Sequence, residues 1–160
     1  MTLPASTCPD NESSDCFVCL LLTTGRNGDI LVREHQGITT DVLTKYFVRA
    51  SCGSLKDKPK LFFIQIYEDS KELSTAYDFR IPAEFDFFLG YAISKSGEGK
   101  PNLVQAVDTV LRDTVAPYQT VELHDIMRKA ARMVSDASTT SSYMSTLRRR
   151  VVLGIKQLLL

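Results

Sequence analysis

The sequence lacks an excess charge of either sign, long hydrophobic runs and clusters of histidine. Its 160 residues carry 19 acidic and 19 basic side chains, so their charges cancel. A balanced charge gives no electrostatic reason to expect nucleic acid or an anionic membrane as a partner. No apolar stretch approaches the roughly 20 residues that a helix needs to cross a bilayer. We therefore expect no membrane span.

The amino-terminal segment lacks the apolar core of a secretory signal. Residues 1–15 are polar and include Pro4 and Pro9. A signal peptide would need an apolar stretch of about 7–15 residues in this region. We expect residues 1–15 to form a flexible leader and the protein to be cytoplasmic.

Metal-binding and disulfide patterns are also scarce. The chain has four cysteines: Cys8, Cys16, Cys19 and Cys52. Disulfides are not expected in a protein without a secretory signal. The spacing of Cys16 and Cys19 would suit zinc, but it opens an apolar run, and no second pair of this kind follows. The only histidines, His35 and His124, stand alone in the sequence. We predict no metal and no cofactor.

Apolar runs and amphipathic segments alternate along the rest of the chain. Strands are predicted at residues 17–22, 61–65, 85–93 and 151–155, and helices at 39–47, 102–116 and 121–134. Loops are predicted at residues 70–79, 94–101 and 135–142. Continuously apolar strands that alternate with helices indicate an α/β domain whose mainly parallel sheet is covered on both faces. We expect residues 16–160 to form this single domain.

The segment that points to a function is the strand at residues 61–65 together with the residues that follow it, up to Asp69. The apolar run ends in Gln65-Ile-Tyr-Glu-Asp69. This layout resembles the active-site strand of caspases, in which Gln-Ala-Cys-Arg-Gly presents the nucleophilic cysteine. Tyr67 stands at the position of that cysteine.

Other segments resemble the same family in the same order. Residues 16–25 are similar to the strand and turn that end in Ser-His-Gly, with Thr24 in place of the basic histidine and Gly25 retained. Residues 54–65 are similar to Ser-Leu-x-x-Lys-Pro-Lys-Leu-x-x-x-Gln, and residues 81–87 to Ile-Pro-x-x-x-Asp-Phe.

The resemblance implies a three-layer α/β/α sandwich whose mainly parallel sheet has an antiparallel final strand. It divides the domain into a large-subunit-like part (16–69), a short linker (70–79) and a small-subunit-like part (80–160). The family's first strand–helix–strand unit has no counterpart, so we expect an N-terminally truncated domain. The edge at residues 17–22 is then uncovered, and an exposed apolar edge is an aggregation hazard.

The chemistry of the two replaced residues argues against proteolysis. Caspases need a thiolate nucleophile and a histidine that manages protons. A phenol such as that of Tyr67 is a bulky and poor substitute for a thiol. The hydroxyl of Thr24 cannot act as a general base near neutral pH, and loss of such a base typically costs about 10²–10⁴ in rate.

The aspartate-binding pocket also departs from the family pattern. The resemblance implies that Gln65 and two arginines would bind the substrate carboxylate, because such recognition rests on charge-assisted pairs. One arginine belongs to the absent upstream unit, and the loop at residues 94–101 offers neither tryptophan nor arginine. The linker is shorter than is usual in the family, and its one aspartate, Asp78, is followed by the bulky Phe79. Cleavage into two subunits is therefore not expected.

We therefore interpret the chain as a catalytically inactive caspase homologue that regulates an active caspase by heterodimerisation, in apoptosis. The resemblance implies a dimer in which final strands pair edge to edge, and Val151, Val152, Leu153, Gly154 and Ile155 are the predicted interface. The sequence leaves inhibition and activation equally open.

Two alternatives stay open at this point. The chain could be a homodimeric adaptor that neither cleaves peptides nor binds caspases. It could also be a residual cysteine hydrolase with a displaced nucleophile at Cys52, although no base accompanies that thiol. Gln65 and Gly25 could likewise persist only because they support the local backbone, and Tyr67 could either plug the former site or be a tolerated aromatic.

Overall fold

The computed structural model describes residues 11–26, 29–33, 36–68, 77–95, 101–114, 120–135 and 139–154. Its strands are β1 (Phe17–Arg26), β2 (Asp29–Arg33), β3 (Gln36–Ile38), β4 (Lys60–Glu68), β5 (Phe87–Lys95), β6 (Thr120–Glu122), β7 (Thr139–Ser145) and β8 (Val152–Gly154). Its α-helices are α1 (Thr40–Thr44), α2 (Leu103–Thr114) and α3 (Leu123–Val134), with short 3₁₀ turns η2 (Lys45–Phe47) and η3 (Gly53–Leu55). No helix within these ranges is long and apolar enough to cross a bilayer.

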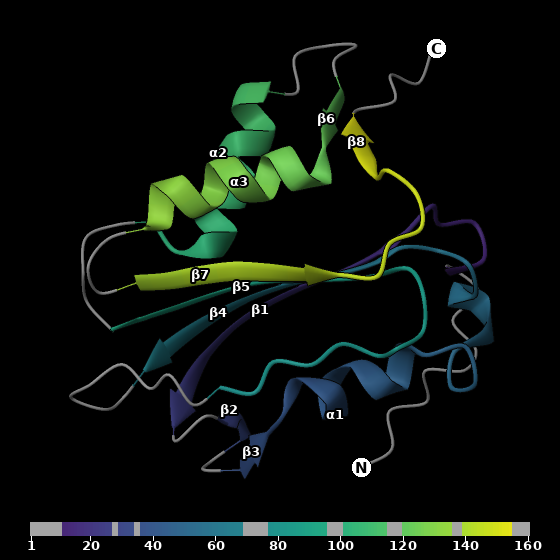
Figure 1. Ribbon diagram of the computed structural model, residues 1–160, viewed down its shortest axis with the longest axis horizontal. Coiled ribbons are helices and arrows are strands. Elements are labelled where there is room, and N and C mark those ends of the chain that lie inside the picture. The colour runs from purple at the N-terminus through teal and green to yellow at the C-terminus, as the bar shows by residue number, and fades with distance from the viewer. Residues whose placement is uncertain are drawn as a thin grey trace.

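Six strands form one sheet in the order β3-β2-β1-β4-β5-β7. The three central strands β1, β4 and β5 are parallel, and β7 runs antiparallel to β5. Helices α2 and α3 cover one face and α1 lies against the other, which gives three layers (Figure 1). The predicted α/β/α sandwich with an antiparallel final strand is therefore confirmed.

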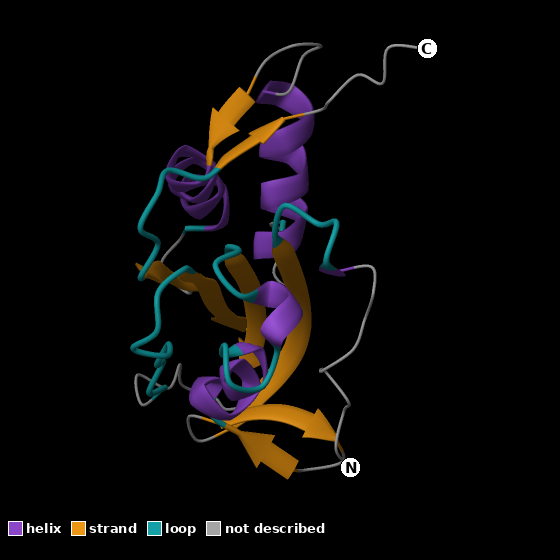
Figure 2. Ribbon diagram, turned by 90° about the vertical axis from the view of Figure 1, so that its right-hand side faces the viewer, coloured by secondary structure: helices purple, strands orange, loops and turns teal. Residues whose placement is uncertain are grey.

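Two expectations for the carboxyl-terminal part are wrong. Residues 139–142, predicted to lie in a loop, belong to β7, which completes the edge of the large sheet. Val152–Gly154, predicted to be that edge, form β8 and pair with β6 in a separate two-stranded sheet (Figure 2). Residue 155 lies outside the described residues.

Packing explains why residues 152–154 do not form the edge of the large sheet. Val151 is buried, and Leu153 packs against the same hydrophobic cluster as α2 and α3. An apolar segment gains more by covering this cluster than by lining a solvent-exposed edge. The polar sequence Thr-Thr-Ser-Ser of β7, with two β-branched threonines, suits an edge strand, because its backbone still completes the ladder of β5.

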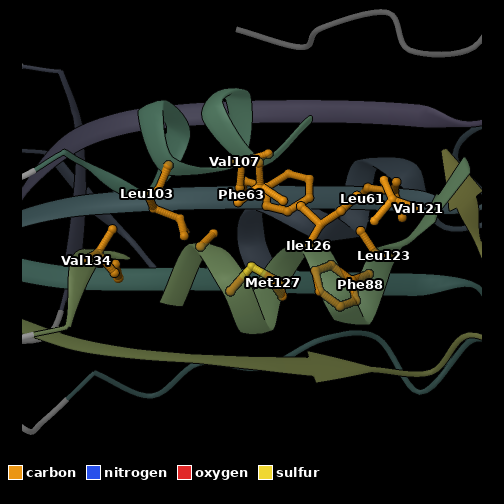
Figure 3. Close-up of a cluster of buried hydrophobic side chains, with 14 of the residues drawn as sticks. Leu61, Phe63, Phe88, Leu103, Val107, Val121, Leu123, Ile126, Met127 and Val134 are labelled. Atoms are coloured by element: carbon orange, nitrogen blue, oxygen red, sulfur yellow. The ribbon is translucent and has the colours of Figure 1, made fainter. Parts of the chain in front are cut away.

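Each face of the sheet carries its own hydrophobic cluster. The cluster under α2 and α3 joins the two helices to strands β4 and β5, with Phe63, Phe88, Leu103 and Met127 among its members (Figure 3). The cluster on the α1 face contains alternate residues of the same strands, including Phe62 and Ile64. β4 is thus buried on both faces, as its continuous apolar run predicts.

Strand β1 does not match the prediction that it is buried on both faces. On the α1 face, Phe17, Cys19 and Leu21 pack against the cluster there. On the opposite face, large apolar side chains remain about half exposed, at 47%, 52% and 49% for Val18, Leu20 and Leu22. The core under α2 and α3 is built on β4 and β5, and none of its members comes from β1.

The start of helix α2 is the best-predicted boundary. The side chain of Asn102 accepts a hydrogen bond from the backbone N–H of Gln105 at 2.9 Å, and the side chain of Gln105 accepts one from the N–H of Asn102 at 3.0 Å. This reciprocal pair is a capping box. Thr39, the first residue of the helix predicted at 39–47, is the N-cap of α1, but its side chain makes no capping hydrogen bond.

An ion pair ties the end of β7 to the start of β5. The Arg148 guanidinium donates to the buried carboxylate of Asp86, with an Nε–Oδ2 distance of 3.2 Å, and also pairs with Asp57. Burial raises the pKa of the Asp86 carboxyl, but the hydrogen bonds and charge of Arg148 outweigh burial, so the net pKa lies below its usual value. The ionised form of Asp86 therefore stabilises the fold.

We expect Arg148→Met to lower the free energy of unfolding by about 2 kcal/mol at pH 7, because it leaves a buried carboxylate without its partner. Since the folded pKa of Asp86 lies below the unfolded one, this contribution is complete above about pH 4 and is lost as the pH falls through the folded value. Urea unfolding of both proteins between pH 7 and pH 3 measures the difference.

The matched control for this prediction is Arg128→Met on α3. Arg128 pairs with Asp125 at 2.7 Å, but both side chains are about half exposed. A surface pair of this kind contributes about 0–1 kcal/mol. If both variants were equally stable at pH 7, the Arg148–Asp86 pair would contribute no more to the free energy of unfolding than a surface pair.

Candidate functional site

The parallel strands bring the sequence-predicted site residues together at their carboxyl ends. In the sheet register, Thr24 of β1 lies beside Tyr67 of β4, and Tyr67 lies beside Ser94 of β5. One residue further along, Gly25 lies beside Glu68. The two positions that resemble the catalytic pair are therefore neighbours in space, as the sequence resemblance predicts for the family's site.

The groups at these two positions are a hydroxyl and a phenol. Thr24 is exposed at the end of β1, and Tyr67 is partly buried. Nothing of the described strand ends β1, β4 and β5 supplies a thiol or an imidazole beside them. The arrangement can donate and accept hydrogen bonds, but it lacks the nucleophile and base that thiol proteolysis requires.

The three cysteines among the described residues lie elsewhere in the fold. Cys52 is 1% exposed and sits before η3, where its Sγ lies 3.6 Å from the Oγ of Ser54. Cys16 and Cys19 lie at the amino end of β1, and burial raises the pKa of both thiols. A raised pKa depletes the thiolate, which is the nucleophilic form.

Gln65 is held by three hydrogen bonds, and its side chain is only 1% exposed. Its amide nitrogen donates to the Oγ of Ser94 at 3.0 Å and to the carbonyl oxygen of Ile66 at 3.3 Å. Its carbonyl oxygen accepts from the backbone N–H of Leu103 at 2.8 Å, at the first turn of α2. Gln65 thus joins β4, β5 and α2, which is a role that needs no substrate.

A second buried polar side chain, that of Glu68, lies on the opposite face of β4 at the same end of the strand. Glu68 is 3% exposed, and one oxygen of its carboxylate accepts a hydrogen bond from the hydroxyl of Tyr77. Its other oxygen, Oε1, has no hydrogen-bond partner in the described part of the chain. Burial, together with the hydrogen bond and charge of Glu68, raises the pKa of Tyr77, so the phenol stays protonated and keeps donating.

Tyr77 fills the space beside Gly25. A Cβ atom placed on Gly25 would lie 1.8 Å from the hydroxyl oxygen of Tyr77 and 2.5 Å from Cγ2 of Ile66. Tyr77 is stacked on Phe79, and Phe79 on Tyr91. The glycine is therefore required here by close packing of the last residues of the linker.

We expect Gly25→Ala to lower the free energy of unfolding by about 2–4 kcal/mol. The new methyl group displaces Tyr77, which leaves the buried carboxylate of Glu68 without its donor. Chemical denaturation measures the effect, and Gly53→Ala is the matched control because no atom lies within 4 Å of its Cβ position.

A double-mutant cycle with Tyr77→Ala isolates the cause. In the Tyr77→Ala background most of the clash has gone, so Gly25→Ala should cost much less than it does alone. Equal costs in both backgrounds would show that the close approach of Tyr77 is not the reason for the glycine.

Glu68 and Tyr77 were missed by the sequence interpretation. The signal was a carboxylate that directly continues a strand buried on both faces, where an unpaired charge is costly. Its partner could not be named in advance, because Tyr77 lies nine residues further along, within the predicted linker. Residues 70–76 of that linker and residues 96–100 of the predicted pocket loop lie outside the described residues, as does His35. His124 is described, and its ring packs against those of Phe88 and Tyr143.

The fold and the matched segments define a caspase domain. Residues 5–152 match the family model of the Caspase domain, so the chain belongs to the caspase family of cysteine peptidases. The structure resembles that of caspase-1 from Spodoptera frugiperda with a TM-score of 0.70 and 26% identity, over 94% of this chain and 68% of that one. The predicted family and fold are confirmed.

Two curated relatives illustrate the range of the family that this chain resembles. Caspase-8 of Rattus norvegicus is 32% identical over 107 residues, which cover 54% of this chain and 22% of that protein. The "CASP8 and FADD-like apoptosis regulator" of Mus musculus is 38% identical over 60 residues, which cover 36% of this chain and 12% of that protein. The chain thus spans about a fifth of the length of the first of these relatives and less of the second.

Proposed function

We propose that this chain is a catalytically inactive caspase homologue that regulates an active caspase by forming a heterodimer with it. The observation that carries the proposal is the pair Thr24 and Tyr67, which lie side by side where the family's histidine and cysteine belong. In this proposal the catalytic pair is lost, while the parallel strands β1, β4 and β5 and the antiparallel edge strand β7 remain.

Two further features support the absence of proteolysis, and the name of one relative supports a regulatory role. Gln65 uses both ends of its amide within the fold, so neither end is open to a substrate carboxylate. Tyr77 fills the space beside Gly25. The similar mouse protein bears the name of an apoptosis regulator, which is consistent with a regulatory role in apoptosis.

The contact surface we propose is the outer edge of β7, in place of the strand that the sequence interpretation had assigned. β7 ends the large sheet on the β5 side. The resemblance to the family implies edge-to-edge pairing of such final strands, which adds main-chain hydrogen bonds between two sheets. A partner caspase paired here would be either held in an active shape or kept from pairing with itself.

Light scattering of mixtures tests the proposal. The chain is combined with each caspase of the same organism, and the mass of any complex is measured. We expect a one-to-one complex with at least one caspase. Absence of a complex with every candidate would reject the proposal and favour the homodimeric adaptor.

The hydrolase alternative is tested separately with a thiol-reactive activity probe and a peptide panel. We expect neither labelling nor turnover from the isolated chain. Turnover that disappears on Cys52→Ser would instead support the displaced nucleophile.

A further inference from the structure

Strand β1 has an unpaired backbone edge beside its half-exposed apolar side chains. β2 pairs with β1 only at Gly25 and Arg26. Within the described residues, no strand pairs with Phe17–Thr24 on the side away from β4. The hydroxyl of Thr23 donates to the carbonyl oxygen of Leu31 in β2, so β2 still lies against β1 at that residue. The free edge is therefore residues 17–22 of β1.

The direction of the free backbone groups follows from one hydrogen bond. The N–H of Phe17 donates to the carbonyl oxygen of Pro59 at 2.9 Å, on the β4 side. Backbone groups of successive strand residues point to alternate sides of the strand. Val18, Leu20 and Leu22 therefore direct their N–H and C=O groups toward the free edge.

The same three residues carry the exposed side chains. Their register with β4 places Leu20 beside Phe63, a member of the cluster under α2 and α3. The three side chains thus form an apolar stripe on the α2–α3 face, just beyond the part that the helices cover. Natural edges are usually protected by charges, proline or bulges, and residues 17–24 contain no charge and no proline.

We propose that this edge pairs with the β1 edge of a second copy of the chain, antiparallel and centred on Leu20. The row of apolar residues Val18, Leu20 and Leu22 is symmetric about Leu20. A two-fold axis at Leu20 places Leu20 opposite Leu20 of the second copy and Val18 opposite Leu22, so every outward backbone group meets a partner and each apolar stripe meets an apolar stripe. The uncharged stretch brings no like charges together.

The proposal does not depend on caspase binding. β4 and β5 separate β1 from β7 in the sheet. One chain could therefore bind a second copy through β1 and a caspase through β7 at the same time.

Sedimentation of the full chain at increasing concentration tests the proposal. We expect a reversible dimer of twice 17.9 kDa. Leu20→Lys and Leu20→Glu should each raise the dissociation constant at least about tenfold, because like charges directly opposite one another are destabilising. An equimolar mixture of the two variants should dimerise again, since Lys then faces Glu across the axis.

The mixture and two controls keep the result interpretable. Recovery in the mixture shows that neither variant failed through misfolding. Met133→Lys on α3 and Tyr143→Lys on β7 replace other exposed apolar residues and should leave this dimer intact. A monomer at all concentrations, a dimer indifferent to Leu20, or no recovery in the mixture would each overturn the proposal, and sensitivity to Tyr143→Lys alone would assign the dimer to β7.

Discussion

The double variant Thr24→His/Tyr67→Cys is expected to remain inactive toward aspartyl peptides, at least about 10⁴-fold below an active caspase. The substitutions restore a thiol and an imidazole at two neighbouring positions. They do not restore recognition of the substrate carboxylate, and loss of buried polar recognition is itself enough to cost about 10⁴–10⁵ in specificity. Gln65 remains bonded to Ser94 and Leu103.

The measurement is initial-rate cleavage of a fluorogenic aspartyl peptide, with an active caspase as the positive control. Thiol titration confirms that the new cysteine at position 67 is reduced and accessible. Cleavage within about tenfold of the active caspase would mean that the pocket is intact, which would contradict the interpretation of this chain as a lost enzyme.

Ser141→Pro is expected to weaken binding to a partner caspase at least about 100-fold. The N–H of Thr146 donates to the carbonyl oxygen of Phe87 at 2.9 Å, so alternate residues of β7 bond to β5 and Ser141 directs its N–H outward. Proline removes that donor and blocks strand addition, yet it is tolerated on an edge strand when its nitrogen faces away from the sheet.

Ser141→Ala is the matched control, because it removes the hydroxyl and keeps the backbone donor. We expect it to bind the caspase like the unmodified chain in isothermal titration calorimetry. If Ser141→Pro folded normally and bound with unchanged affinity, the β7 edge would not be the contact surface.

Locally encoded features of the fold could be predicted from the sequence. The β4 strand is a continuous apolar run, and Asn102 begins α2 because its side chain and that of Gln105 cap one another. Thr24 and Tyr67 each lie near the carboxyl end of a predicted parallel strand, and the two residues are neighbours in the sheet. Patterns of this kind depend on residues close in sequence.

Non-local contacts decided the parts that the sequence did not reveal. β7 has a polar sequence typical of a loop, and it is a strand only because β5 supplies its partner groups. An apolar run such as β1 looks the same whether or not a helix covers it, so the exposure of Leu20 could not be foreseen. The hydrogen bond from Tyr77 to Glu68 likewise joins a residue of the linker to the end of β4.

The most direct test of the central claim is the rate of peptide cleavage by an active caspase of the same organism during titration with this chain. The account predicts no cleavage by the chain alone and a saturable change in the caspase rate that reaches its limit at one chain per caspase. It also predicts that Ser141→Pro abolishes this change. Cleavage by the chain itself, or a rate that never changes with any caspase, would contradict the account.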